Sequence, residues 1–138
     1  MTEANKDIVR RFNDGITSFF QGGDLAFADL IDPAATIAVP GMPTDVEGLK
    51  QVLPAFRAAL SEFQMTVSNM VADGDLVAYE ALWTAKHTGE LMGIPPSGNT
   101  ISVSETHVER VHDGKIVEHR GNWDQMGMMQ QMGAIPTP

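Results

Sequence analysis

The sequence contains no cysteine, few basic residues and no long hydrophobic run. Without cysteine there can be no disulfide framework, thiolate zinc site or thiol nucleophile. The 9 basic residues against 18 acidic ones give a formal charge of −9, which repels phosphate backbones and anionic lipid surfaces. No apolar run approaches the roughly 20 residues that span a bilayer, and the N-terminus resembles no signal or transit peptide. We therefore expect neither nucleic acid nor membrane as a partner, and a cytoplasmic location.

The length of 138 residues predicts one domain covering residues 1–138. In the first half, apolar positions recur at three- and four-residue spacing, which is the helical period. Asp24 would cap a helix over residues 24–30, and Pro54 would kink the helix over residues 46–60 or delay its start. The pattern predicts helices over residues 2–20, 24–30 and 46–60, and a short extended segment over residues 36–39.

The second half changes to the patterning of strands, expected over residues 64–72, 76–88, 100–111 and 115–123. Asp73-Gly74-Asp75 and Asp113-Gly114 are turn signals that join these strands into two hairpins. Residues 89–99 form a loop, and Asp124 would cap a final short helix. Helices followed by meandering antiparallel strands define an α+β class. A curved sheet with helices on one face tends to enclose a small-molecule cavity.

The residues suited to chemistry gather in the last hairpin: Glu105, His107, Glu109, Glu118, His119, Arg120, Asn122 and Asp124. Which of them share a face depends on the turn at Asp113-Gly114. A two-residue turn would pair His107 with Arg120, whereas a three-residue turn would pair His107 with His119 and Glu105 with Gly121. No spacing of histidines and carboxylates requires a metal, so we expect none.

Four motifs in order carry a family resemblance: His87-Thr88-Gly89, Met92-Gly93-Ile94-Pro95-Pro96, Asp113-Gly114-Lys115-Ile116 and Gln131-Met132-Gly133. Together they resemble the SnoaL-like polyketide cyclase (ester cyclase) family of the nuclear transport factor 2-like superfamily. The resemblance implies a cone-shaped α+β fold, in which N-terminal helices pack on the concave face of a curved antiparallel sheet. It also implies an apolar pocket, a homodimer, and ring closure of an aromatic polyketide ester by aldol condensation without cofactor or metal.

Carried over residue by residue, the family's pocket histidine is His107, its glutamine position holds Glu105, and its catalytic aspartate position holds Gly121. These positions share a face in the three-residue register, so the resemblance favours that register, with Glu105 directly opposite Gly121. We hypothesise that the acid/base group has moved from position 121 to Glu105, with His107 as its catalytic partner. Burial in an apolar pocket would favour such a role.

Further side chains are expected to line a substrate site: His119, Gly121, Trp83, Trp123, Phe19, Phe56 and Met92. Each candidate also has a structural interpretation. Glu105 could be a solvated strand carboxylate and His107 an interior histidine held by hydrogen bonds. His87 and His119 could be structural, and Asp124 suits a helix cap more simply than a catalytic acid. The methionines near the C-terminus would fill a core or a subunit contact.

The leading functional prediction is a cofactor-independent enzyme that performs acid/base chemistry, cyclisation or isomerisation, on an apolar polyketide-like carbonyl compound. One base near an activated C–H and one donor near the developing enolate oxygen suffice for such reactions. The alternative is a non-catalytic small-molecule-binding or dimerisation module of the same fold, which Gly121 favours because the family's aspartate is absent there.

Overall fold

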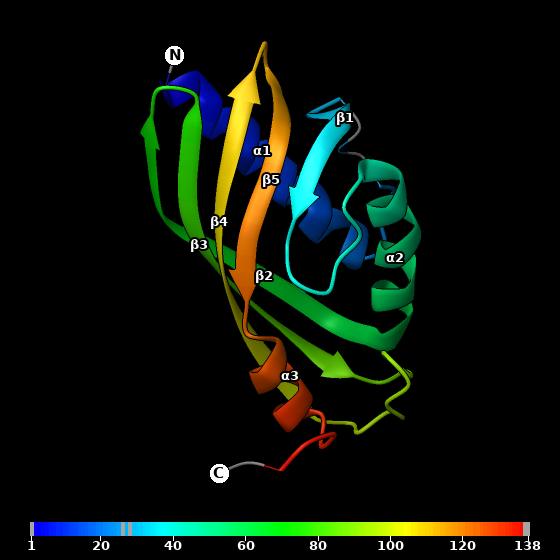
Figure 1. Ribbon diagram of the computed structural model, residues 1–138. Coiled ribbons are helices and arrows are strands. Elements are labelled where there is room, and N and C mark those ends of the chain that lie inside the picture. The colour runs from blue at the N-terminus through cyan, green and yellow to red at the C-terminus, as the bar shows by residue number, and fades with distance from the viewer. Residues whose placement is uncertain (1, 26, 28, 137–138) are drawn as a thin grey trace.

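Over residues 2–25, 27 and 29–136, which the computed structural model describes, three helices surround one five-stranded sheet (Figure 1). The α+β class is therefore confirmed. The sheet is strongly curved, and α1 crosses behind it while α2 lies beside its β1 edge (Figure 1). The elements, in chain order, are α1 (Thr2–Phe20), β1 (Ile31–Ala38), α2 (Val46–Ala59), β2 (Leu60–Asp73), β3 (Leu76–His87), β4 (Thr100–His112), β5 (Lys115–Trp123) and α3 (Gln125–Gln131).

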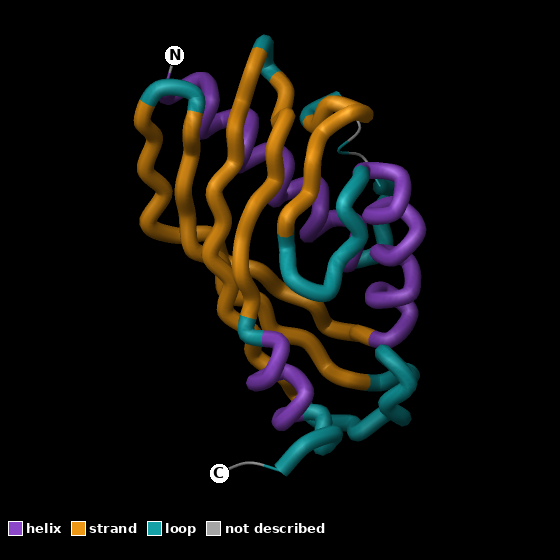
Figure 2. Tube along the Cα trace, in the orientation of Figure 1, coloured by secondary structure: helices purple, strands orange, loops and turns teal. Residues whose placement is uncertain are grey.

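The strands lie in the order β1-β5-β4-β3-β2, so the first strand of the chain forms one edge of the sheet and lies next to the last strand (Figure 2). The β2–β3, β3–β4 and β4–β5 pairs are antiparallel, as the meander predicts. The β1–β5 pair is parallel, and this pairing was not expected from the sequence. It matters for the site because Ile37 lies opposite His119, which brings the β1–α2 segment over the functional hairpin.

The β4–β5 hairpin combines a two-residue turn with a one-residue bulge. Asp113 and Gly114 both have positive φ values, 50° and 77°, as a type I′ turn requires. His112 pairs with Lys115 and Val111 with Ile116, but Arg110 then pairs with Glu118, so Val117 is the extra residue of a β-bulge. From there on, His107 pairs with Gly121, Glu105 with Trp123 and Glu109 with His119.

The predicted three-residue register is therefore wrong. It placed His107 opposite His119 and Glu105 opposite Gly121, whereas each of these partners lies two residues further along β5. The turn chemistry at Asp113-Gly114 is the simple two-residue kind, and the bulge then shifts the ladder by one position. Because the shift is a single residue, the odd-numbered side chains of both strands come to the same face of the sheet beyond the bulge, from the Glu109–His119 pair onward.

The concave face of the sheet carries the core. Alternate residues of β3 are buried there, including Val77, Tyr79, Ala81 and Trp83, each at most 5 % exposed. They pack against the apolar stripe of α1, where Val9, Phe12 and Phe19 are buried. The N-terminal helix thus covers the concave face, as the predicted cone-shaped fold requires.

Two local predictions are corrected. The helix expected over residues 24–30 does not form in the described part of this segment, residues 24, 25, 27, 29 and 30. Phe27 is fully buried and β1 begins at Ile31 rather than Thr36, so core burial and pairing with β5 outweigh local helix propensity. The third predicted helix starts at Val46 without delay, capped by Asp45, and Pro54 lies within it.

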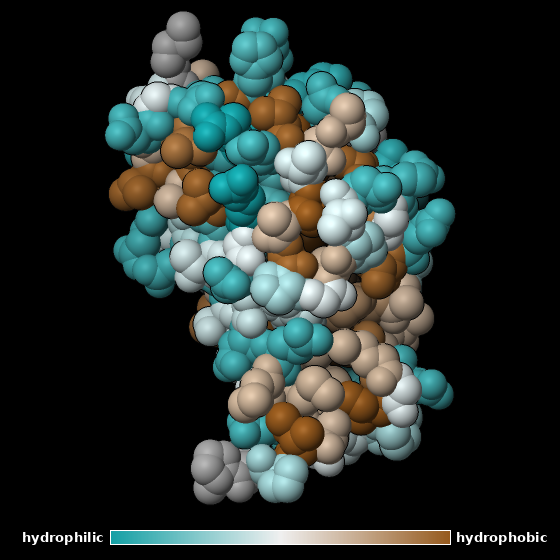
Figure 3. Space-filling view, viewed as in Figure 1, coloured by the Kyte–Doolittle hydropathy of each residue, from teal (hydrophilic) through white to brown (hydrophobic). Residues whose placement is uncertain are grey.

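At the lower end of the molecule in Figure 1, α3 packs against β4 and leads into the C-terminal segment. Asp124 accepts a hydrogen bond of 2.9 Å from the Gly127 amide, which confirms the predicted helix cap. In Figure 3, hydrophobic residues show both over the upper part of this face and around its lower end, with polar residues among them. None of the described helices combines the length and hydropathy needed to cross a membrane.

Candidate active site

An apolar cavity of about 120 Å³ lies between the concave face of the sheet, α1 and the β1–α2 segment. Aromatic and aliphatic side chains form most of its wall. Four polar residues line it among those the structure describes: Asn13, Glu105, His107 and His119. Such a combination, an apolar enclosure with a few converging polar groups, is typical of a small-molecule site.

Glu105 and His107 form a short hydrogen-bonded pair on the cavity wall. Both are odd-numbered residues of β4, so their side chains project from the same face. His107 Nε2 lies 2.6 Å from Glu105 Oε1, and the indole Nε1 of Trp83 on β3 donates to Glu105 Oε2 at 2.6 Å. The Glu105 side chain is 21 % exposed and that of His107 6 % exposed. The carboxylate is thus fixed from two sides and remains open to the cavity.

Both ring nitrogens of His107 face hydrogen-bond acceptors. Nδ1 lies 3.2 Å from the carbonyl oxygen of Arg120, and Nε2 faces the Glu105 carboxylate. Burial lowers the pKa of His107, but the hydrogen bond and charge of Glu105, the charge of Glu109 and the Arg120 carbonyl outweigh burial and raise this pKa above 6.5. The two acceptors at its ring nitrogens and the raised pKa both favour the protonated form of His107, an imidazolium beside a carboxylate.

Gly121 makes room for this arrangement. A Cβ atom at position 121 would collide with Nδ1 of His107 and would lie 2.6 Å from the carbonyl oxygen of Thr106. The His107 ring thus occupies the space that any side chain at position 121 would need. The sequence predicts Glu105 opposite Gly121, but His107 lies there. Glu105 lies two residues before His107 on the same strand and reaches the site from that position.

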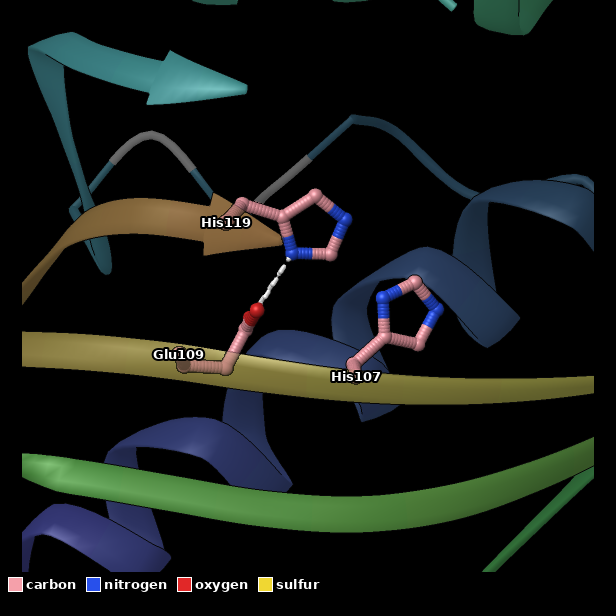
Figure 4. Close-up of side chains that lie close together, drawn as sticks. All are labelled: His107, Glu109 and His119. Atoms are coloured by element: carbon pink, nitrogen blue, oxygen red, sulfur yellow. Dashed lines mark hydrogen bonds and ion pairs between the residues drawn. The ribbon is translucent and has the colours of Figure 1, made fainter. Parts of the chain in front are cut away.

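A second carboxylate–imidazole pair lies next to the first. Glu109, fully buried, accepts from His119 Nδ1 at distances of 2.6 and 2.9 Å to its two oxygens. The His119 ring stacks on the His107 ring with centroids 4.8 Å apart. Figure 4 shows the three side chains, with a dashed line from His119 to Glu109. Sequence alternation alone did not place Glu109 inside the molecule, although it is two residues beyond His107 on the same strand.

Tyr79 closes the inner side of this cluster. Its ring stacks on His107 with centroids 5.5 Å apart, and its hydroxyl has no hydrogen-bond partner among the described residues. Burial, and then the negative charge of Glu109, raise the pKa of Tyr79 well above its usual value. The phenol therefore stays neutral across the physiological range and adds no charge to the site.

His107, Glu109 and His119 could be considered as metal ligands, since their donor atoms lie within 4.8 Å of one another. The two imidazole planes are inclined by only 19°. Imidazole binds metals through in-plane lone pairs, and those of stacked, nearly parallel rings do not converge on one point. The Glu105 and Glu109 carboxylates also engage one nitrogen of each ring. The geometry fits proton transfer better than metal binding.

The remaining sequence candidates divide into two groups. Phe56, Trp83 and Trp123 line the cavity together with His119. The indole nitrogen of Trp123, however, already donates to the Pro40 carbonyl at 2.7 Å.

Phe19, Gly121 and Met92 do not line the cavity. Phe19 packs under the Arg57 guanidinium, 4.2 Å from the ring centroid. Met92 is 49 % exposed in the loop after β3. Phe19 and Met92 depart from expectation because an apolar residue type does not show which surface it faces.

Two residues outside the predicted site also bear on it, His87 and Asn13. His87 is buried and its Nδ1 accepts from the Ser97 amide at 3.2 Å, so it holds the 89–99 loop, as its structural interpretation suggested. Asn13 was missed: it lines the cavity from α1 and its Nδ2 donates to the Val9 carbonyl. A polar residue beside Phe12, on the apolar stripe of the helix, was the available signal.

The fold and the site define a small α+β protein that encloses an apolar chamber with carboxylate–imidazole pairs on its wall. The family model of the SnoaL-like polyketide cyclases matches residues 8–132. The chain therefore belongs to the SnoaL-like polyketide cyclase family, as the sequence motifs implied.

Individual relatives agree with this assignment. The chain is 28 % identical over 127 residues to nogalonic acid methyl ester cyclase of Streptomyces nogalater, covering 91 % of this chain and 92 % of that one. Over 54 residues, 38 % of this chain and 37 % of the other, it is 41 % identical to aklanonic acid methyl ester cyclase DnrD of Streptomyces peucetius. The crystal structure of IdmH from Streptomyces antibioticus superposes with a TM-score of 0.77 at 33 % identity, covering 94 % and 98 % of the two chains.

Proposed function

We propose that this protein is a cofactor-independent ester cyclase that closes a ring on an apolar polyketide ester by acid/base catalysis. The observation that carries the proposal is the Glu105–His107 pair, joined at 2.6 Å on the wall of an apolar cavity. The relatives named as methyl ester cyclases support the choice of substrate class.

The pair has the chemistry that ring closure needs at oxygen. When a carbon nucleophile attacks a carbonyl carbon, negative charge develops on the carbonyl oxygen, and a nearby proton donor stabilises it. The acceptors at both ring nitrogens of His107 and its raised pKa favour a proton on the pair. Glu105, fixed by Trp83 and open to the cavity, relays this proton to the substrate oxygen. Glu105 thus provides the carboxyl group that the family's aspartate would supply at position 121.

The test is turnover of nogalonic acid methyl ester and aklanonic acid methyl ester. Intramolecular aldol addition gives a product of unchanged mass, so chromatography with mass detection separates substrate from ring-closed isomer. We expect saturable isomer formation by the wild-type protein, together with a change in tryptophan fluorescence, because both tryptophans of the chain line the cavity. Glu80→Gln is the matched control, since Glu80 is an exposed carboxylate of β3.

The competing function is a ligand-binding module without turnover, which Gly121 favours because the family's catalytic aspartate is absent. Saturable binding of both esters with no isomer formation across a pH series would establish that alternative and refute the enzyme.

The homodimer also remains a proposal. It rests on the family resemblance, since Met126 on α3, 65 % exposed, is a single apolar side chain rather than a patch. Light scattering after size exclusion would give twice the mass of one chain for a dimer and the mass of one chain otherwise.

A further inference from the structure

The Glu109–His119 pair is a second proton-transfer unit on the same cavity wall. His119 lines the cavity and its side chain is 13 % exposed, whereas Glu109 is fully buried beneath it. A carboxylate buried this completely is costly unless a hydrogen-bonding or charged partner compensates it. Among the residues that the structure describes, the hydrogen-bond partner of Glu109 is Nδ1 of His119, at 2.6 Å.

The position of Glu109 determines which nitrogen of His119 carries a proton. An ionised carboxylate only accepts hydrogen bonds, so Nδ1 must donate. In the neutral imidazole the lone pair then lies on Nε2. No described residue hydrogen-bonds to that Nε2 atom. His119 therefore presents a free basic nitrogen, whereas both nitrogens of His107 are engaged with acceptors.

We propose that His119, oriented by Glu109, is the general base of the reaction, and that the Glu105–His107 pair is the general acid. This assignment rests on the proposed ester cyclase function. Nε2 of His119 takes the proton from a C–H flanked by carbonyl groups. The C–H electron pair forms the new bond to the carbonyl carbon, and the carbonyl π pair moves to oxygen, which takes the proton held by the Glu105–His107 pair. The product is an isomer, and exchange with water resets both pairs.

The stacking of the two rings suits this division of roles. With centroids 4.8 Å apart, two imidazolium rings would repel each other in a medium of low dielectric. In the proposed step His119 gains a proton as the Glu105–His107 pair loses one, so the stack never needs to carry two positive charges. The charge of Glu109 stabilises the imidazolium that forms on His119. Tyr79, the titratable group facing the stack from β3, stays neutral.

The first experiment separates C–H removal from ring closure. Aklanonic acid methyl ester in deuterium oxide is followed for deuterium uptake and for isomer formation. We expect His119→Asn to slow both by roughly 100-fold or more, the usual range for a lost general base. Glu105→Gln should slow ring closure by roughly 100-fold or more while deuterium uptake continues. Glu109→Gln, a positioning variant, should lower kcat with KM unchanged, and Glu80→Gln should match wild type.

The second experiment is made on the wild-type protein, and a variant serves only to assign the signals. Long-range ¹H–¹⁵N correlation of the imidazoles in the wild-type protein should show a proton on Nδ1 of His119 and none on Nε2 in the neutral form, with assignment from His119→Gln.

The outcomes separate the two claims. A neutral His119 protonated on Nε2, or a His119→Asn variant that exchanges deuterium within twofold of wild type, overturns the base assignment and leaves the cyclase function standing. If the wild-type protein shows neither deuterium exchange nor turnover, the cyclase function is overturned, and the base assignment with it.

Discussion

The space at Gly121 gives the sharpest structural prediction. Gly121→Ala adds one methyl group where the structure has no room, against the His107 ring and 2.6 Å from the Thr106 carbonyl oxygen. Strands normally prefer alanine to glycine, so propensity alone would predict a gain in stability. We expect instead a loss of about 1–3 kcal/mol, the usual cost of overpacking a filled interior.

Thermal unfolding followed by circular dichroism measures this loss. For a chain of this length, each kcal/mol lowers Tm by roughly 3–6 °C. A double-mutant cycle with His107→Ala isolates the clash with the ring. In the His107→Ala background, the loss of stability caused by Gly121→Ala should be smaller by roughly 0.5–3 kcal/mol. The loss that remains is due to the contact with the Thr106 carbonyl oxygen.

A stability change within 0.5 kcal/mol for Gly121→Ala would refute the reasoning, as would equal costs in the two backgrounds. The same geometry predicts that Gly121→Asp does not simply restore the family's aspartate. Its side chain would have to displace His107 and so break the bond to Glu105, with lower turnover as the expected result.

Three further predictions concern the site and its frame. Glu105→Gln should lower the pKa of His107, measured by NMR titration. The pKa of His107 is raised in the folded protein. The stabilisation that the Glu105–His107 pair contributes is therefore full below about pH 6.5 and is lost as the pH rises through the folded pKa. The stability difference between Glu105→Gln and wild type should thus be largest at acidic pH. Trp83→Phe leaves one Glu105 oxygen without its donor and should cost about 1–3 kcal/mol in denaturant unfolding, together with reduced ring closure. Asp124→Ala should cost about 0.5–2 kcal/mol through the lost helix cap, against less than about 0.5 kcal/mol for Asp7→Ala on the exposed face of α1.

Local patterns predicted the parts of the fold that local chemistry decides. The turn residues Asp113 and Gly114, the cap at Asp124 and the alternating strands all lie where the sequence places them. The pairing of β1 with β5 is different, because it joins residues more than 80 positions apart and leaves no local signal. The missing helix before β1 has the same origin, since Phe27 is buried in the core.

The site was predictable in composition but not in geometry. Alternation along β4 correctly groups Glu105 with His107 on one face. The bulge at Val117, however, does not follow from the turn residues, and with it His107, not Glu105, lies opposite Gly121. The burial of Glu109 likewise depends on α1 covering the sheet, which no strand pattern reveals.

The most direct test of the central claim compares initial rates of ring closure of the same polyketide methyl ester by wild type, Glu105→Gln and Glu80→Gln. If the carboxylate held by His107 and Trp83 delivers the proton, Glu105→Gln should be slower by roughly 100-fold or more, with Glu80→Gln unchanged. Equal rates for wild type and Glu105→Gln would contradict the account.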